Sequence, residues 1–147
     1  MLQSPLFTTV AGSALWVPEV PGLMLRLQGD VSLAQYQLLL NHGLQMYRAR
    51  AHPATPAHWI ADLRQLSSLA PDAQQWMAAD WNPRAHAAGL RHLRFVEASA
   101  SKQPLAHQLR TTCLELETET ALWLSHHETL EAAIQQARQA ASATAPG

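Results

Sequence analysis

Eight histidines are the residues of this sequence that most readily suggest a metal site. His126 and His127 are adjacent, and because neighbouring side chains of a strand point to opposite faces, this pair cannot easily share one ion. His86 and His92 fall on different expected elements, and the single cysteine, Cys113, leaves no second thiol to complete a zinc set. We therefore expect no metal and no other cofactor, and interpret the histidines as scattered surface residues.

The serine, cysteine and glycine residues do not form the patterns of nucleophilic or phosphate-transferring enzymes. No Gly-x-Ser-x-Gly sequence occurs, which is the turn that holds the nucleophile of many hydrolases. Cys113 falls on the apolar stripe of an expected helix, as a packed thiol does. The six glycines are dispersed, with neither Walker-type nor dinucleotide-type spacing. We expect no catalytic residue and predict that the chain is not an enzyme.

Five tryptophans are a high count for this length, and three of them lie close together in the expected order of elements. Trp59 falls on a strand, and Trp76 and Trp81 fall on the helix that follows. Five residues are about 140° round an α-helix, so Trp76 and Trp81 cannot both lie at the centre of one buried stripe. One of them is expected at an edge, where an exposed tryptophan is typical of a binding surface or pocket mouth. Trp59, Trp76 and Trp81 are thus a candidate ligand or partner surface.

Strands precede the first helix that would position these residues. Leu6–Val20 is rich in strand-forming residues and contains Gly12, which predicts two short strands joined by a turn at Ala11–Ser13. Leu23–Gln28 predicts a third strand that ends at Gly29-Asp30. Ser32 is a candidate N-cap for a helix over Leu33–Arg50. Apolar residues recur on one face of this helix at spacings of three and four: Leu33, Tyr36, Leu40, Leu44 and Tyr47.

Strands and helices alternate through the rest of the chain. The short apolar run His58–Leu63 is typical of a strand covered on both faces. Pro71 suits the first position of the next helix because it has no N–H to leave unpaired, and Pro83 is expected to end that helix. The remaining expected elements are a strand at Leu90–Ala98, a helix from Pro104, a strand at Ala121–Leu124 and a helix at Glu128–Ala141.

This order predicts an α/β fold with a single mixed, mainly parallel sheet. An N-terminal β-hairpin would form one edge, and about four helices would pack on the sheet. At 147 residues the chain has the size of one domain, residues 1–147, with 142–147 as a flexible tail.

Composition narrows the class of protein further. Hydrophobic residues make up 48% and charged residues 14%, which is a globular rather than a disordered composition. A net charge of −1 gives no electrostatic footprint for nucleic acid, so no nucleic-acid partner is expected. One cysteine excludes an internal disulfide. With no visible signal peptide and no apolar run of transmembrane length, we expect a cytoplasmic protein that is not integral to a membrane.

Three segments resemble the STAS domain of SpoIIAA-like anti-sigma-factor antagonists. Trp59–Leu66 is similar to the apolar strand with Asp-Leu that precedes the family's signature loop, and Leu69–Trp76 lies where that loop opens the second helix. Trp123–Ala133 resembles the last strand, polar cap and Ala-rich helix of bacterial STAS/SEC14-like proteins. The resemblance spans roughly residues 23–138 and implies the STAS architecture for the expected sheet.

The chain departs from this family at its phosphorylated loop. The resemblance implies an Asp-Ser-Ser-Gly-like loop whose second serine is phosphorylated by a partner kinase, and by position Asp72 replaces that serine here. Asp72 either imitates the phosphorylated state or simply favours a helix N-terminus electrostatically, and the second reading is preferred. Ser67 and Ser68, just upstream, are alternative acceptors. Together with Asp62 they are the candidate equivalents of the phosphorylated loop.

Three hypotheses for function stay open. The first is a non-enzymatic regulatory or protein–protein interaction module that lacks the phosphorylatable serine. The second, implied by the SEC14-like resemblance, is a carrier of a small apolar ligand or lipid, with a cavity between the second helix and the sheet. The third is an enzyme of unknown class, which would need a cleft with converging titratable groups. A homodimer could form through the edge of the N-terminal hairpin or an exposed helix face.

Overall fold

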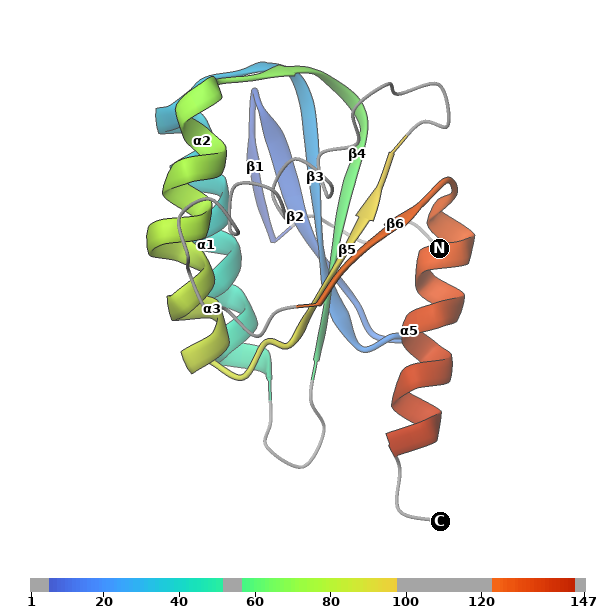
Figure 1. Cartoon of the computed structure of the whole chain (residues 1–147). Coiled ribbons are helices and arrows are strands. Elements are labelled where there is room, and N and C mark those ends of the chain that lie inside the picture. The colour runs from blue at the N-terminus through green and yellow to red at the C-terminus, as the bar shows by residue number, and fades with distance from the viewer. Residues whose placement is uncertain (1–5, 52–56, 98–122, 145–147) are drawn as a thin grey trace.

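Six strands form one mixed sheet in a computed structural model that describes residues 6–51, 57–97 and 123–144 (Figure 1). The strands lie in chain order across the sheet: β1 (Phe7–Thr9), β2 (Gly12–Val17), β3 (Gly22–Val31), β4 (His58–Leu69), β5 (His92–Val96) and β6 (Trp123–His127). β1, β2 and β3 pair antiparallel, whereas β3 to β6 pair parallel. The α/β class and the N-terminal hairpin are confirmed. The sheet is mixed, with three parallel strand pairs and two antiparallel ones, so its parallel part is larger than its antiparallel part by only one pair.

The hairpin and β3 differ from expectation in their boundaries. β1 and β2 are joined by a turn as predicted, but it lies over Val10 and Ala11, and Gly12 and Ser13 already pair in β2. A Cβ at Gly12 would collide with the carbonyl oxygen of Arg26 on β3. β3 does not end at Gly29 but continues to Val31. Gly29 has a φ of +68°, which glycine adopts without strain, and the pairing of β3 with β4 shifts register directly after it. The glycine therefore interrupts the ladder locally and does not end the strand.

Helix α1 (Leu33–Arg50) has the predicted bounds and cap. The Ser32 hydroxyl accepts a hydrogen bond from the Gln35 backbone N–H, and the Gln35 side chain accepts one from the Ser32 N–H, which completes a capping box. Four of the five predicted apolar positions are buried, and the fifth, Leu33, packs against the core at its margin: Tyr36, Leu40, Leu44 and Tyr47 form the buried stripe. The spacing argument for this helix is confirmed.

The helical segment after β4 is longer than the sequence predicts. α2 (Pro71–Trp76) begins at Pro71 as expected, but it passes through a π-helical turn, η1 (Met77–Trp81), into α3 (Asn82–Ala87). Pro83 therefore does not end the helix. The Asn82 N–H reaches back five residues to the carbonyl of Met77, so the turn before Pro83 is widened. A widened turn relieves the clash between a proline ring and the preceding turn that normally breaks a helix.

The helices divide between the two faces of the sheet (Figure 1). α1, α2 and α3 cover one face, where a large apolar cluster includes Leu25, Trp59 and Phe95. α5 (Leu130–Thr144) covers part of the other face and packs through Ala133 and Ala137 against a smaller cluster. The predicted helix from Pro104 lies outside the described residues. α5 extends to Thr144, so residues 142–144 of the expected tail are helical, and residues 145–147 lie outside the described residues. No helix in the described ranges is long and apolar enough to cross a membrane.

Candidate functional site

The tryptophans are positioned by the interface between the sheet and the helices α1 to α3. Trp59 and Trp81 are 1% and 0% exposed, and their rings meet edge to face with centroids 5.1 Å apart. The Trp81 indole N–H donates to the carbonyl of Leu40 at 3.0 Å. Trp76 is partly buried and meets Tyr36 edge to face at 6.1 Å. Trp59 and Trp81 are therefore core residues and not part of a binding surface, and Trp76 is the one at the edge.

The same rings occupy the space that a carrier of apolar ligands would need. Trp59, Met77 and Trp81 are each at most 2% exposed and belong to one packed cluster between the second helical segment and the sheet. The Tyr36 hydroxyl donates to the Met77 sulfur at 2.9 Å inside this cluster. The position proposed for an apolar cavity is thus filled by side chains of the protein itself.

The candidate phosphorylation residues lie where β4 gives way to α2. Ser67 and Ser68 are exposed residues near the end of β4, and the Ser68 hydroxyl donates to the Asp30 carboxylate at 2.7 Å. Asp72 is exposed in the first turn of α2, directly after Pro71. The N-cap of this helix, Ala70, offers no side-chain oxygen to its free N–H groups. An acidic residue in a first turn is favourable because the helix dipole is positive there.

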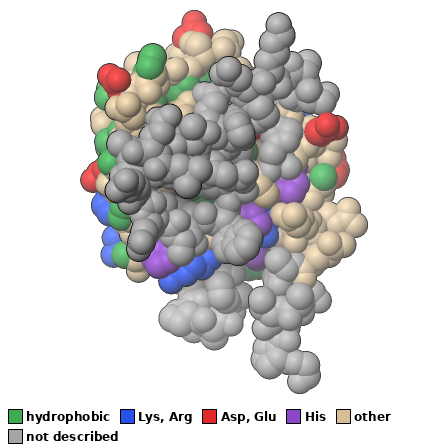
Figure 2. Space-filling model, in the orientation of Figure 1, with side chains coloured by type: hydrophobic (Ala, Val, Ile, Leu, Met, Phe, Trp, Pro, Cys, Tyr) green, Lys and Arg blue, Asp and Glu red, His purple; other side chains and the backbone are tan. Residues whose placement is uncertain are grey.

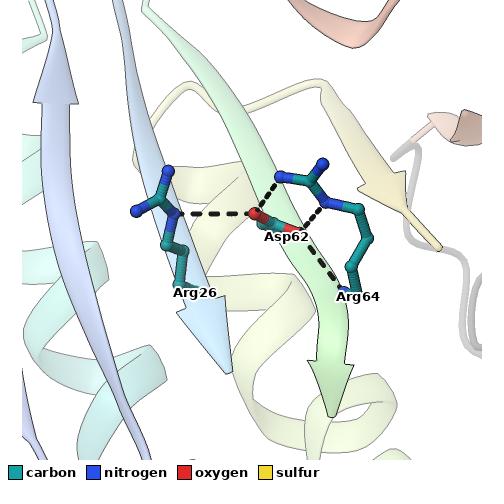
Figure 3. A network of polar contacts seen from close by, with 3 residues as sticks. All are labelled: Arg26, Asp62 and Arg64. Carbon is teal, nitrogen blue, oxygen red and sulfur yellow. Dashed lines mark hydrogen bonds and ion pairs between the residues drawn. The ribbon is translucent and has the colours of Figure 1, made fainter. Parts of the chain in front are cut away.

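Asp62 lies apart from that junction, on the face of β4 opposite to Trp59 and Ala61, where it binds two arginines (Figure 3). The Arg64 Nε and Nη2 atoms donate to its two oxygens, each at 2.9 Å, and the Arg64 backbone N–H donates to Oδ1 at 3.2 Å. The Arg26 Nε lies 3.5 Å from Oδ2. The Asp62 side chain is 6% exposed, whereas those of Arg26 and Arg64 are 48% and 39% exposed.

The two arginines decide the charge state of Asp62. Burial acts to raise the pKa of this carboxyl, but hydrogen bonds from the side chain and backbone of Arg64 oppose it. These hydrogen bonds, together with the positive charges of Arg64 and Arg26, hold the pKa of Asp62 below its usual value. The group is thus an ionised carboxylate at neutral pH, held between two guanidinium groups.

A backbone irregularity lies in the ladder of β3 and β4 directly after Asp62. Arg26 on β3 pairs with Asp62, but Gln28 pairs with Gln65, so two steps on β3 face three steps on β4. Such a β-bulge adds one residue to a strand and changes the direction of its side chains, and it is rare between parallel strands. Here Arg64 and Gln65 are consecutive and both exposed. The bulge therefore interrupts the alternation of side chains along β4 directly beside the contacts of Asp62 with Arg64.

These residues line a groove of about 380 Å³ on the sheet. Besides the three charged residues, its lining includes Ser13, Gln28 and Gln65, with Leu27 as its one apolar residue. Ser13, Arg26 and Asp62 are register partners across β2, β3 and β4, so they form one polar row. This volume is at the small end of the range for small-molecule sites.

A second polar cluster lies under α5, next to strands β4, β5 and β6. The Ser125 hydroxyl lies 2.8 Å from the His92 Nε2 and 3.0 Å from the His127 Nε2. Arg94, 1% exposed, donates through Nε to the Gln136 side chain on α5 at 3.0 Å and contacts the His58 Nδ1 at 3.1 Å. Figure 2 shows histidine side chains (purple) and arginine side chains (blue) at the surface in the lower half of this view.

Two histidines of this cluster are held neutral. Burial, and after it the nearby charge of Arg94, lowers the pKa of both His58 and His92 to about 4. A serine between two imidazoles has the spacing of a nucleophile and its base, but here the rings also anchor strands to one another. Among the residues that the structure describes, no group of three or more His, Cys, Asp or Glu side chains is placed to hold a metal ion.

The sequence reasoning did not identify Arg26, Arg64 or the His92–Ser125–His127 contacts. Arg26 is flanked by the buried Leu25 and Leu27, so its direction follows from strand alternation alone. Arg64 lies two residues after Asp62 in β4, so the same alternation could have placed the two opposite charges on one face, whereas the exposure of Gln65 beside them depends on the bulge. Cys113, the remaining residue considered for chemistry, lies outside the described residues.

The order of elements and the arrangement of helices on the two faces define a SpoIIAA-like fold. In a comparison with solved structures, the chain is similar to an uncharacterized protein of the DUF3478 family from Shewanella loihica PV-4, which has a SpoIIAA-like fold. The TM-score is 0.56 at 13% sequence identity, and the match covers 92% of this chain and 98% of that one. At this identity the likeness shows the fold alone. The sequence matches no family model and no curated protein.

Proposed function

We propose that this chain is a non-enzymatic, STAS-like regulatory or protein–protein interaction module that has lost the phosphorylatable serine. The SpoIIAA-like fold supports the class of module. The observation that carries the proposal is the exposed carboxylate of Asp72 in the first turn of α2, directly after β4. By the resemblance of the sequence, this position corresponds to the serine that SpoIIAA-like antagonists present to a partner.

A fixed charge at this position gives the module a constant binding state. A phosphoserine carries about −1.5 to −2 charge and can be removed by a phosphatase, whereas Asp72 carries about −1 and cannot. The module would therefore bind its partner without a kinase, and regulation would depend on the amount of either protein. We also propose a cytosolic location, from the single cysteine and the absence of any need for disulfides.

The test is affinity capture from cells that express the protein naturally, followed by binding measurements with the purified partner. Asp72→Lys should weaken binding to the partner by about tenfold or more, because it places a positive charge where the interface receives a negative one. Glu19→Lys is the matched control, since Glu19 is also an exposed acidic residue but lies in the turn between β2 and β3.

A partner that binds wild type and Glu19→Lys alike but loses affinity for Asp72→Lys supports the proposal. Equal binding by all three proteins would exclude the β4–α2 junction as the interface. Circular dichroism of each variant separates a local effect from unfolding. Ser67→Ala and Ser68→Ala, which remove the alternative acceptors, should leave binding unchanged.

A further inference from the structure

The groove between Arg26 and Arg64 contains guanidinium nitrogens that do not contact Asp62. Arg64 donates hydrogen bonds to Asp62 through Nε and Nη2, and its third nitrogen, Nη1, makes no hydrogen bond in the described part of the chain. Arg26 lies 3.5 Å from Asp62 through Nε, and within residues 6–51, 57–97 and 123–144 its two terminal nitrogens make no hydrogen bond. In Figure 3 the two guanidinium groups face each other across Asp62.

The lining of the groove selects a polar, negatively charged ligand. Two arginines and one carboxylate give a local charge of about +1, and the carboxylate is buried while the guanidinium groups are exposed. Ser13 and Gln65 add a hydroxyl and an amide from the neighbouring strands. Guanidinium groups bind phosphate and carboxylate oxygens with particular strength because their paired donors match the spacing of two oxygens.

We propose that this groove is a binding site for the oxyanion, phosphate or carboxylate, of a small polar molecule, held between the free ends of Arg26 and Arg64. The site is on the sheet face opposite to α2, so it is separate from the surface around Asp72 and does not depend on the function proposed above. Leu27 is the one apolar residue of the lining, and this favours a polar metabolite over a lipid chain.

Asp62 and the bulge act as positioning features for this site. Three hydrogen bonds fix Arg64 against Asp62, so its side chain is already ordered before a ligand arrives. Ordering a long side chain in advance lowers the entropic cost of binding. Strand alternation alone places Arg64 on the same side of β4 as Asp62. The β-bulge adds the next residue, Gln65, to the surface beside them, which an ordinary strand would not do.

The test is a titration of ¹⁵N-labelled protein with inorganic phosphate, and separately with citrate, at constant ionic strength and pH 7. Chemical shifts at Ser13, Arg26 and Arg64 should change in a saturable way, with a Kd in the millimolar range for so small an ion. Arg26→Gln should raise this Kd by about tenfold or more. Tighter binding of phosphate or of citrate identifies which oxyanion the groove prefers, and either result supports the site.

Arg84→Gln is the matched control. Arg84 is 45% exposed and binds Asp80 at 2.8 Å, so it has the exposure and the acidic partner of the groove arginines without a second arginine opposite. This variant should keep the Kd of wild type. Arg64→Gln should also weaken binding, but it removes the main partner of buried Asp62 and could unfold the chain. Arg26→Gln leaves the Asp62–Arg64 contacts in place, so the proposal can be decided by that variant.

A substitution at Glu131, in the first turn of α5, should strengthen phosphate binding rather than weaken it. Its charge acts on Arg64 from beyond ion-pair distance. Glu131→Gln should tighten phosphate binding by about two- to threefold, because a partly screened negative charge is removed from the site. Shifts that do not saturate, or that persist unchanged in Arg26→Gln, would mean an adventitious ion only and would overturn the proposal.

Discussion

At the scale of single residues, the core depends on a close contact between α1 and the ring of Trp59. Gly43 faces this ring, and a Cβ built on Gly43 would lie 2.8 Å from the Trp59 Cη2 atom and 3.3 Å from a methyl of Leu23. Trp59 in turn contacts Trp81 and Tyr47. Because these neighbours are fully buried, the ring has little freedom to move away.

Gly43→Ala should therefore destabilise the protein, although alanine is the better helix former. The gain in helix propensity is about 1 kcal/mol, while the clash with Trp59 should cost about 1–3 kcal/mol. Urea unfolding of wild type, Gly43→Ala, Trp59→Phe and the double variant forms a cycle that isolates the contact. The penalty of Gly43→Ala should shrink when phenylalanine replaces Trp59. A Gly43→Ala protein more stable than wild type would show that the helix can move away from the sheet.

At the scale of elements, the two helices that follow β3 and β4 begin in contrasting ways. α1 begins with a complete capping box between Ser32 and Gln35. α2 begins after Ala70 with no side-chain cap, and Pro71 removes one N–H that would otherwise need a partner. The cap of α1 thus contributes stability that α2 lacks.

Ser32→Ala should cost about 1 kcal/mol of unfolding free energy, because it leaves the Gln35 N–H without its acceptor. Ser32→Asp, which keeps an acceptor oxygen, should retain most of the stability. The reciprocal change, Ala70→Ser, should add a few tenths of a kcal/mol or more at the start of α2. Chemical denaturation of the three variants measures these effects, and a Ser32→Ala protein as stable as wild type would argue against the cap.

Elements with strong local signals are the ones that the sequence predicts well. Ser32 and the apolar spacing of α1 give that helix its bounds, and Pro71 gives the start of α2. The continuation past Pro83 needs a π-helical turn, and the extension of β4 to Leu69 needs pairing with a β3 that bends at Gly29. Both depend on contacts between distant segments. The Arg26–Asp62 contact escaped prediction for the same reason, because strand register brings these two residues together.

At the scale of the whole molecule, the two faces of the sheet differ in chemistry. The face under α1, α2 and α3 is apolar and closed, with the tryptophans in its interior. The other face carries α5 on one side and exposes charged residues beside it, including Arg26 and Arg64. Stability therefore resides mainly on the first face, and the second face is where polar ligands and protons can act.

Stability should depend on pH through the histidines of that second face. The pKa of His58 and of His92 is lowered to about 4 from an ordinary 6.5, with burial as the first cause and the charge of Arg94 as the second. His127 also faces His92. Between pH 6.5 and 4 the unfolded chain binds more protons than the folded one, so unfolding free energy decreases as pH falls through this range. Above pH 6.5 the contribution is fully present.

Lowering the pH from 7 to 5 should reduce stability by about 1–2 kcal/mol, after a discount for the solvent that still reaches both rings, and should lower Tm by several degrees. His58→Asn and His92→Gln keep a polar atom near Nδ1 and Nε2, respectively, but do not titrate. Each should flatten the dependence of Tm on pH, whereas His86→Gln on α3 should not. An equal slope in all four proteins would show that these two imidazoles are solvated enough to be protonated without loss of the fold.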